Sequence, residues 1–200
     1  MKQETGLSTL SLAILGLVSQ RPLTGYDVRK VFATTPMGHF SSSPGAIYPA
    51  LKRIEDAGWV RGRAGQGKTH RQRMLYEITP HGLEVLKQHL SQPVTRDDVI
   101  WHLDDLMMRF AFMGGVIGCE GTVRFLQDFA SQIDGYVMVL RGYLSSVKDI
   151  MPPCGRLAME NGIQGYEMNA QWARRAIKEL QGNPQQADGT THVSRRGRKE

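Results

Sequence analysis

Apolar residues recur at helical spacing along most of this chain, but not within residues 59–79. This interruption restricts the fold more than any other feature of the sequence. This segment alternates as strands do, with one strand predicted over Trp59–Arg63 and a second over Arg71–Thr79. Between them lies most of the Gly-rich stretch GRAGQGKT, Gly62–Thr69. Two strands joined by such a loop are typical of a β-hairpin. The sequence therefore predicts a mainly α chain with a small β-hairpin wing.

The stretch Gly62–Thr69 also matches the nucleotide-binding signature G-x-x-x-x-G-K-[ST] letter for letter. That loop binds phosphate when a buried strand leads into it and a helix starts at its Lys-Thr end. Here the following residues, HRQRMLYEITPHG, alternate and stop at Thr79-Pro80, which indicates a strand. A hairpin tip is the preferred interpretation, and a P-loop-like nucleotide-binding protein stays open as an alternative.

Helical segments surround the hairpin. Helices are predicted over about residues 7–19, 24–35, 43–57 and 80–92. Thr24 and Asp27 have the spacing of a capping box, and Ser43 before Pro44 is a good helix start. Pro49 conflicts with its helix, since an interior proline costs about 3 kcal/mol. Three helices, a hairpin and a helix follow the order of a winged helix-turn-helix domain, predicted over residues 1–92.

Residues 93–182 have a longer helical pattern. Apolar residues recur at spacings of three and four through 126–150 and again through 159–180. We expect an α-helical dimerisation domain here, because such a stripe is too long for one small domain to cover. The predicted interface residues are Leu126, Phe129, Ile133, Tyr136, Leu140, Tyr143, Tyr166 and Trp172. The polar, basic residues 183–200 are predicted to be a disordered tail.

Charge is distributed unevenly along the chain. The net charge is +6, but residues 41–73 hold seven Lys/Arg and two Asp/Glu, a net +5. Residues 74–154 hold six Lys/Arg and ten Asp/Glu, a net −4. A basic front segment suggests a polyanion partner, double-stranded DNA.

Other classes of protein receive little support. The two cysteines, Cys119 and Cys154, have no metal-ligand spacing, and no nucleophile–base pair or paired catalytic carboxylate is recognised. We therefore expect no enzyme, no metal and no cofactor. No apolar run is judged long enough to span a bilayer, and the N-terminal apolar stretch is interpreted as a core helix and not as a signal peptide. A cytoplasmic protein is the expectation.

Three blocks of the sequence resemble a known family. LAILGLVSQRPLTGYDVRKVF, SPGAIYPALKRIEDAGWV and YEITPHGLEVL are similar to the PadR family of bacterial transcriptional regulators, over about the first ninety residues. The helices after Pro93 resemble its larger branch, which has a C-terminal helical dimerisation domain. The resemblance implies a cytoplasmic, homodimeric winged-helix repressor, often released from its operator by a small molecule. It also implies that GRAGQGKT lies at the wing tip.

The DNA-binding residues are expected on two elements. The helix that starts at Ser43 would enter the major groove, with Arg53 on phosphate, and the hairpin would follow phosphates with Lys68 at its tip. The predicted set is Ser41, Ser42, Ser43, Tyr48, Lys52, Arg53, Arg61, Arg63, Lys68, His70, Arg71 and Arg73. The pair Arg61 and Arg63, two residues apart, should share one face of its strand.

Two questions stay open at this point. Trp101 and Trp172 are candidates for an effector pocket, although dimer-core packing explains them as well. A winged-helix adaptor that binds a protein partner and no DNA is a third candidate function. The sequence gives neither the operator nor the effector nor the direction of regulation.

Overall fold

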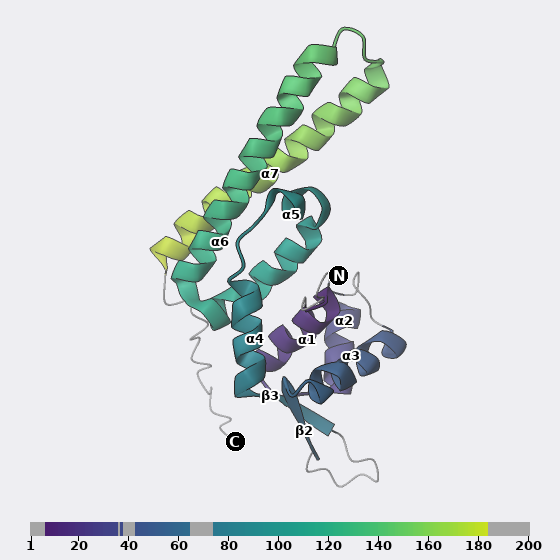
Figure 1. The fold of residues 1–200 in the computed structure, drawn as a ribbon, viewed down its shortest axis with the longest axis vertical. Helices are drawn as coiled ribbons and strands as arrows, with labels where there is room; N and C mark the ends of the chain where they lie inside the picture. The colour runs from purple at the N-terminus through teal and green to yellow at the C-terminus, as the bar shows by residue number, and fades with distance from the viewer. Residues whose placement is uncertain (1–6, 36, 38–42, 65–73, 184–200) are drawn as a thin grey trace, which may run out of the picture.

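The computed structural model describes residues 7–35, 37, 43–64 and 74–183. Figure 1 shows two parts: a compact N-terminal group of helices with a small sheet, and a long arm of two antiparallel helices. The sheet lies at one end of the molecule and the turn of the helical arm lies at the other. The predicted fold class, mainly α with a small β element and long C-terminal helices, is confirmed.

The N-terminal part contains four helices around one core. They are α1 Thr9–Gln20, α2 Gly25–Thr34, α3 Pro44–Asp56 and α4 Pro80–Leu90. The hydrophobic side chains that fill the core are completely or almost completely buried, among them Ile14, Leu15, Phe32, Ile47 and Leu86. α1 is the central helix of this part, since eight consecutive residues of it, Ser11–Val18, are buried. A helix buried on nearly all sides shows only a weak amphipathic pattern, which explains its even apolar composition.

Local capping signals set the helix starts as predicted. The Thr24 side chain accepts from the backbone N–H of Asp27, and the Asp27 carboxylate accepts from the backbone N–H of Thr24, which completes the capping box of α2. Ser43 caps α3 by accepting from the N–H of Gly45, and Pro44 occupies the first helical position. Pro49 lies inside α3 near its start, so the helix continues through it with one backbone bond fewer.

The sheet has three strands, one more than predicted. β1 Leu23–Thr24, β2 Val60–Ala64 and β3 Met74–Ile78 are antiparallel in the order β1-β3-β2. In the hairpin, Val60 is opposite Ile78 and Ala64 is opposite Met74. The two-residue strand β1 was missed because so short a segment has no periodicity of its own. In the order β1-β3-β2, β2 is at the edge of the described sheet, and it contacts α3.

A short helix, α5 Arg96–Trp101, connects the N-terminal part to the arm and was not predicted. Its capping box of Thr95 and Asp98 is present in the sequence as T-x-x-D, the signal that could have revealed it. The next helix, α6 Leu103–Val147, is bent at Gly118, where φ is +72°. This left-handed conformation suits glycine, and it separates the helical stripe before residue 118 from the one after it.

α6 and α7 Pro153–Gly182 pack against each other along the arm. The core between them includes Phe125, Leu126, Phe129, Ile133 and Ala170. Arg141 forms an ion pair with Glu167 at 2.5 Å, and Arg174 forms one with Asp134, so charged pairs also connect the two helices. The arm is thus an intramolecular helical hairpin with its own apolar core.

The dimer interface was predicted because one small domain could not cover so long an apolar stripe. The packing of α6 on α7 shows that the same chain covers much of it. Leu126, Phe129 and Ile133 each have an exposed fraction of 0%, because α7 of the same chain covers them. Tyr136 and Tyr166 contact each other edge to face, with ring centroids 5.1 Å apart, inside the arm. Leu140 is half-buried and Tyr143 is 55% exposed. The spacing of three and four residues does describe a helix-packing seam, but a heptad pattern does not say whether its partner belongs to the same chain.

The length and composition of α6 also correct one expectation. The helix has 45 residues, and an 18-residue stretch of it has a mean hydropathy of 1.2, so it is long and apolar enough to cross a membrane. By length and composition, the prediction that the chain has no such run is therefore wrong. In the structure 39% of the window is buried and the helix packs on α7, α5, α1 and α4. A core helix satisfies the same criteria, which makes this weak support for a membrane span.

Candidate nucleic-acid interface

α3 has one buried face and one exposed face. Ile47, Leu51 and Ile54 point into the core, with exposed fractions of 0%, 0% and 1%. Tyr48 is 47% exposed, and Lys52 is exposed and forms an ion pair with Asp56 at 3.6 Å. This division positions the outer face of the helix rigidly, because the buried residues fix its rotation about its axis. Ser43, Tyr48, Lys52 and Arg53, four of the predicted DNA contacts, are all exposed.

The ring of Tyr48 lies against the start of α2. A Cβ placed on Gly25 would come within 2.6 Å of Cε1 of Tyr48, so any larger residue at position 25 would move the ring. The ring therefore packs closely on the backbone at Gly25. Half-exposed and held on one side, Tyr48 has its hydroxyl available on the surface of α3.

α2 contributes a second exposed aromatic residue. Tyr26 is 53% exposed, and the guanidinium of Arg29 lies over its ring at 5.4 Å from the centroid. About half of the Tyr26 side chain is therefore in solvent. In a helix-turn-helix unit the first helix crosses the DNA backbone, so Tyr26 and Arg29 belong to the candidate interface.

Two arginines mark the base of the wing. Arg61 and Arg63 lie on one face of β2, as their spacing predicted, and both contact the carboxylate of Glu77 on β3. The distances to Oε2 of Glu77 are 3.7 Å from Nη2 of Arg61 and 3.2 Å from Nε of Arg63. No acidic residue lies between Arg61 and Arg63 in the sequence. In the structure an acidic residue does lie beside them, because Glu77 is directly opposite Arg61 in the hairpin register.

Hydrogen bonds connect the wing to the helices at two places. In the middle of β2, the backbone N–H of Gly62 donates to Oε1 of Glu55 on α3 at 3.1 Å. At the base of the wing, the hydroxyl of Thr79 donates to the carbonyl of Gly58 at 2.7 Å and accepts from the N–H of Gly82. These contacts hold β2 and β3 at a defined position beside α3, so the two elements form one continuous surface.

Part of the predicted interface lies outside the described residues. These positions are Ser41, Ser42, Lys68, His70, Arg71 and Arg73. The first described element after GRAGQGKT is β3, which pairs antiparallel with β2. A phosphate loop requires a helix at that place, so the alternative of a P-loop-like nucleotide-binding protein is wrong.

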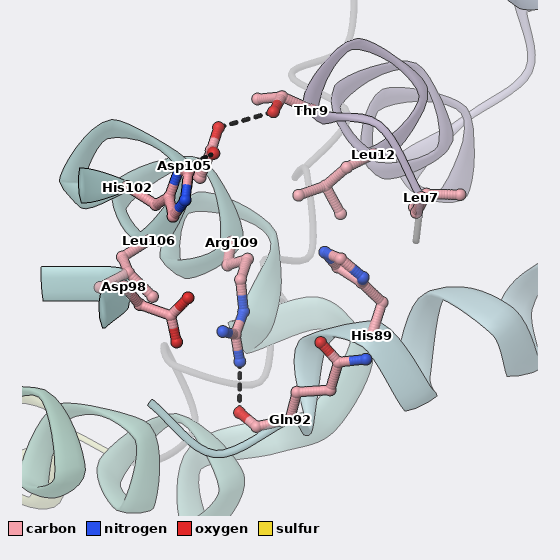
Figure 2. A pocket seen from close by; sticks show the side chains of 10 residues that line it. All are labelled: Leu7, Thr9, Leu12, His89, Gln92, Asp98, His102, Asp105, Leu106 and Arg109. Atoms are coloured by element: carbon pink, nitrogen blue, oxygen red, sulfur yellow. Dashed lines mark hydrogen bonds and ion pairs between the residues drawn. The ribbon is translucent and has the colours of Figure 1, made fainter. Parts of the chain in front are cut away.

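A separate cavity lies between the N-terminal helices and the α5–α6 segment. Its volume is about 220 Å³. Figure 2 shows side chains from α1, α4, α5 and α6 around it. The lining residues are Leu7, Thr9, Leu12, His89, Gln92, Asp98, His102, Asp105, Leu106 and Arg109. Apolar and charged groups therefore meet in one space where the two parts of the chain join.

Arg109 is the buried cation of this cavity. Its exposed fraction is 6%, and Nη2 donates to the carbonyl of Leu90 at 3.3 Å and to that of Gln92. The guanidinium also lies over the ring of Phe125 at 5.1 Å, while its Nε has no hydrogen-bond partner. Burial lowers the pKa of Arg109, although arginine stays charged at any ordinary pH. Arg109 thus connects α6 to the end of α4.

His89 contacts the same cavity from α4. Burial, and after it the charge of Arg109, lowers the pKa of His89, while Asp105 acts in the opposite direction. Its imidazole is therefore neutral at pH 7 and can both donate and accept. Asp105 also accepts from the Thr9 hydroxyl at 2.6 Å, which joins α6 to the start of α1.

The two tryptophans proposed for an effector pocket do not line this cavity. Trp172 is in the arm core, edge to face with Phe110 at 5.2 Å and with Phe129 at 6.3 Å. Trp101 is 75% exposed and borders a shallow hollow of about 320 Å³ at the α5–α6 corner. The two residues thus have different surroundings in the chain, and an effector pocket at either one stays a prediction. Within the described part of the chain, no group of three or more His, Cys, Asp or Glu residues could hold a metal ion.

Comparison with protein families gives a match in the N-terminal part of the chain. Residues 14–88 match the family described as "Transcriptional regulator PadR-like family". The matched segment begins within α1 and ends within α4, so it includes every element of the candidate interface.

Known proteins with similar sequences and folds were also found. The negative transcriptional regulator PadR of Bacillus subtilis (strain 168) is 31% identical over 90 residues, which cover 44% of this chain and 50% of that protein. The chain thus matches about half the length of this relative. Among solved structures, a PadR-like regulator from Bacillus cereus has a TM-score of 0.38 and 24% identity, covering 86% of this chain and 98% of that one. The B. subtilis PadR complex with operator DNA has a TM-score of 0.39 and 22% identity, with coverages of 86% and 98%.

Proposed function

We propose that this chain, whose residues 14–88 match the PadR-like family of transcriptional regulators, binds double-stranded DNA as a homodimer and represses transcription in the cytoplasm. A small molecule that enters the interdomain cavity would release it from DNA. The matched family is one of transcriptional regulators, which supports a role in DNA binding and not in catalysis.

The observation that carries this proposal is the shared surface of α3 and the wing base. α3 exposes Tyr48 and Lys52 on one side, and β2 places Arg61 and Arg63 beside it. An exposed helix next to a cationic hairpin fits DNA, because the helix can read base edges while the hairpin contacts phosphates. An adaptor for a protein partner would not need its cations gathered on these two elements.

Dimerisation is supported by a surface that shares only Tyr143 with the predicted interface. The outer half of the arm exposes the apolar side chains Met138, Val139, Tyr143, Ile150, Leu157 and Met168, by 50% to 84% of their surface. Leu157 and Met168 are eleven residues apart, about three helical turns, so they share one face of α7. Exposed apolar groups concentrated on one arm are typical of an association surface. A second copy of the chain would cover them.

Effector release is supported by the position of the cavity. It is lined by α1 and α4 of the DNA-binding part and by α5 and α6 of the arm. A ligand there would contact both parts and so could change the angle between them, which would alter the separation of two DNA-binding parts in a dimer. Its buried arginine and neutral histidine suit a small polar molecule.

The experiment that tests the proposal measures binding to duplex DNA as salt is increased. A labelled 30-base-pair random duplex and fluorescence anisotropy are sufficient, since phosphate contacts do not depend on sequence. With several cations in each of two protomers, log K should fall against log[salt] with a slope steeper than about −4. Absence of binding, or a flat response to salt, would favour the adaptor.

A further inference from the structure

Glu55 is the only described side chain of α3 that bonds directly to the backbone of the wing. Its Oε1 accepts from the N–H of Gly62 at 3.1 Å, seven residues further along the chain. Its neighbours on α3 have other partners: Lys52 pairs with Asp56 on the exposed face, and Ile54 is buried. One carboxylate therefore connects the helix that would read DNA to the strand that carries Arg61 and Arg63.

The hydrogen bond lies on the open edge of the sheet. Among the residues that the structure describes, β2 pairs only with β3, so the N–H of Gly62 has no described strand on its other side. A carboxylate is a strong acceptor for a backbone N–H, and this bond is charge-assisted. Glu55 thus takes the place of a neighbouring strand and fixes how closely β2 approaches α3.

Residue 62 must be small for this contact to exist. A Cβ at Gly62 would lie 2.5 Å from Oε1 of Glu55 and 2.7 Å from Cε of Met74. Tyr76, opposite Gly62 in the hairpin, has a pKa raised first by burial and then by the charge of Glu55. The carboxylate therefore lies close to both strands of the wing base, with no side chain at position 62 between them.

We propose that Glu55 is a positioning residue that sets the wing relative to α3, so that the wing arginines and the α3 side chains reach one DNA duplex together. This inference rests on the proposed DNA-binding function. The negative charge of Glu55 opposes binding to DNA phosphates. Any favourable contribution of Glu55 to DNA binding must therefore come from its hydrogen bond to Gly62. Charge and position can be separated by substitution.

The test compares Glu55→Gln with Glu55→Ala in the full chain, on the random duplex and with the same anisotropy assay. Glutamine keeps a carbonyl acceptor for the N–H of Gly62 and removes the negative charge, so it should bind at least as tightly as the unmodified chain. Alanine removes the charge and the bond, and should bind about tenfold more weakly, the equivalent of one charge-assisted phosphate contact. The salt slope should become shallower by about one for each phosphate that the variant no longer neutralises.

Two controls keep the interpretation specific. Glu84→Ala changes the net charge equally on α4, where Glu84 is exposed and bonds only Gln88 among the described hydrogen bonds. In a chain that already lacks Arg61 and Arg63, Glu55→Ala should weaken binding no further, while it should keep its effect in a Lys52→Ala chain. Thermal melting of each variant identifies any that does not fold, and Glu55→Gln remains informative if Glu55→Ala does not fold.

The outcomes are distinct. If Glu55→Ala and Glu55→Gln both tighten binding, Glu55 acts by charge alone and the inference is wrong. If Glu55→Ala weakens binding equally with and without the wing arginines, it acts through stability or through α3 and the inference is also wrong. If the unmodified chain does not bind the duplex, the proposed function itself fails.

Discussion

Replacing Glu77 by glutamine should strengthen DNA binding, because this carboxylate competes with phosphate for two arginines. Its Oε2 lies 3.7 Å from Nη2 of Arg61 and 3.2 Å from Nε of Arg63. The arginine side chains are 62% and 56% exposed, and that of Glu77 is 28% exposed. DNA must therefore replace two partly solvated ion pairs before it can take both guanidinium groups.

The size of the effect follows from this exposure. Ion pairs of this kind contribute roughly 0.2–1 kcal/mol each. The two pairs share one oxygen and are not additive, so about 0.5–1.5 kcal/mol is released per protomer, or about two- to tenfold in Kd. The same substitution should lower the free energy of unfolding by no more than about 1.5 kcal/mol, because the same two ion pairs are lost.

The assay is anisotropy on the random duplex at two salt concentrations, with Glu84→Gln as the control that changes charge equally on α4. Glu77→Gln should bind more tightly than both the unmodified chain and the control, and the difference should shrink at higher salt. Equal or weaker binding by Glu77→Gln would refute the reasoning. It would mean that Arg61 and Arg63 do not meet phosphate.

Three further predictions concern stability. Leu126→Ala should lower the free energy of unfolding by about 2–5 kcal/mol, because this side chain is fully buried between α6 and α7, and urea unfolding measures it. Gly82→Ala should cost more than about 2 kcal/mol, since its Cβ would lie 1.9 Å from the carbonyl oxygen of Trp59 and the backbone must move; an unchanged melting temperature would contradict this. Burial and Arg109 lower the pKa of His89 in the folded chain. As pH falls below the ordinary value of about 6.5, the unfolded chain takes up this proton first and stability is lost, so His89→Gln should flatten the loss measured between about pH 7 and about pH 5.

Local signals in the sequence predicted much of the N-terminal part. Helix starts at Thr24 and Ser43 depend on residues within three positions of each other, and the structure contains both caps. The shared face of Arg61 and Arg63 follows from the two-residue repeat of a strand, and it was also predicted. Such features require no knowledge of distant contacts.

Features that depend on distant contacts were missed. Neither the bond between Glu55 and Gly62 nor the pairing of Glu77 with the arginines can be recognised before the hairpin register and its contact with α3 are known. The cavity around Arg109 was missed for the same reason, because its lining joins residues 7–12 to residues 89–109, which are far apart in the sequence. The apolar spacing at Leu126 correctly indicated that this face of the helix packs against another helix. The expected partner was a second copy of the chain, but α7 of the same chain has an equivalent apolar stripe and covers Leu126.

The measurement that tests the central claim most directly is sequencing of the genomic DNA fragments that the purified full chain retains. Base contacts from α3 in each of two protomers predict a small set of strongly enriched fragments that share a two-fold symmetric motif, with half-sites about one helical turn apart or a multiple of it. Enrichment should disappear with Tyr48→Ala and Lys52→Ala together, while random-duplex affinity falls much less. Retained DNA with the same sequence composition as the input would contradict the account of this chain as a sequence-specific regulator.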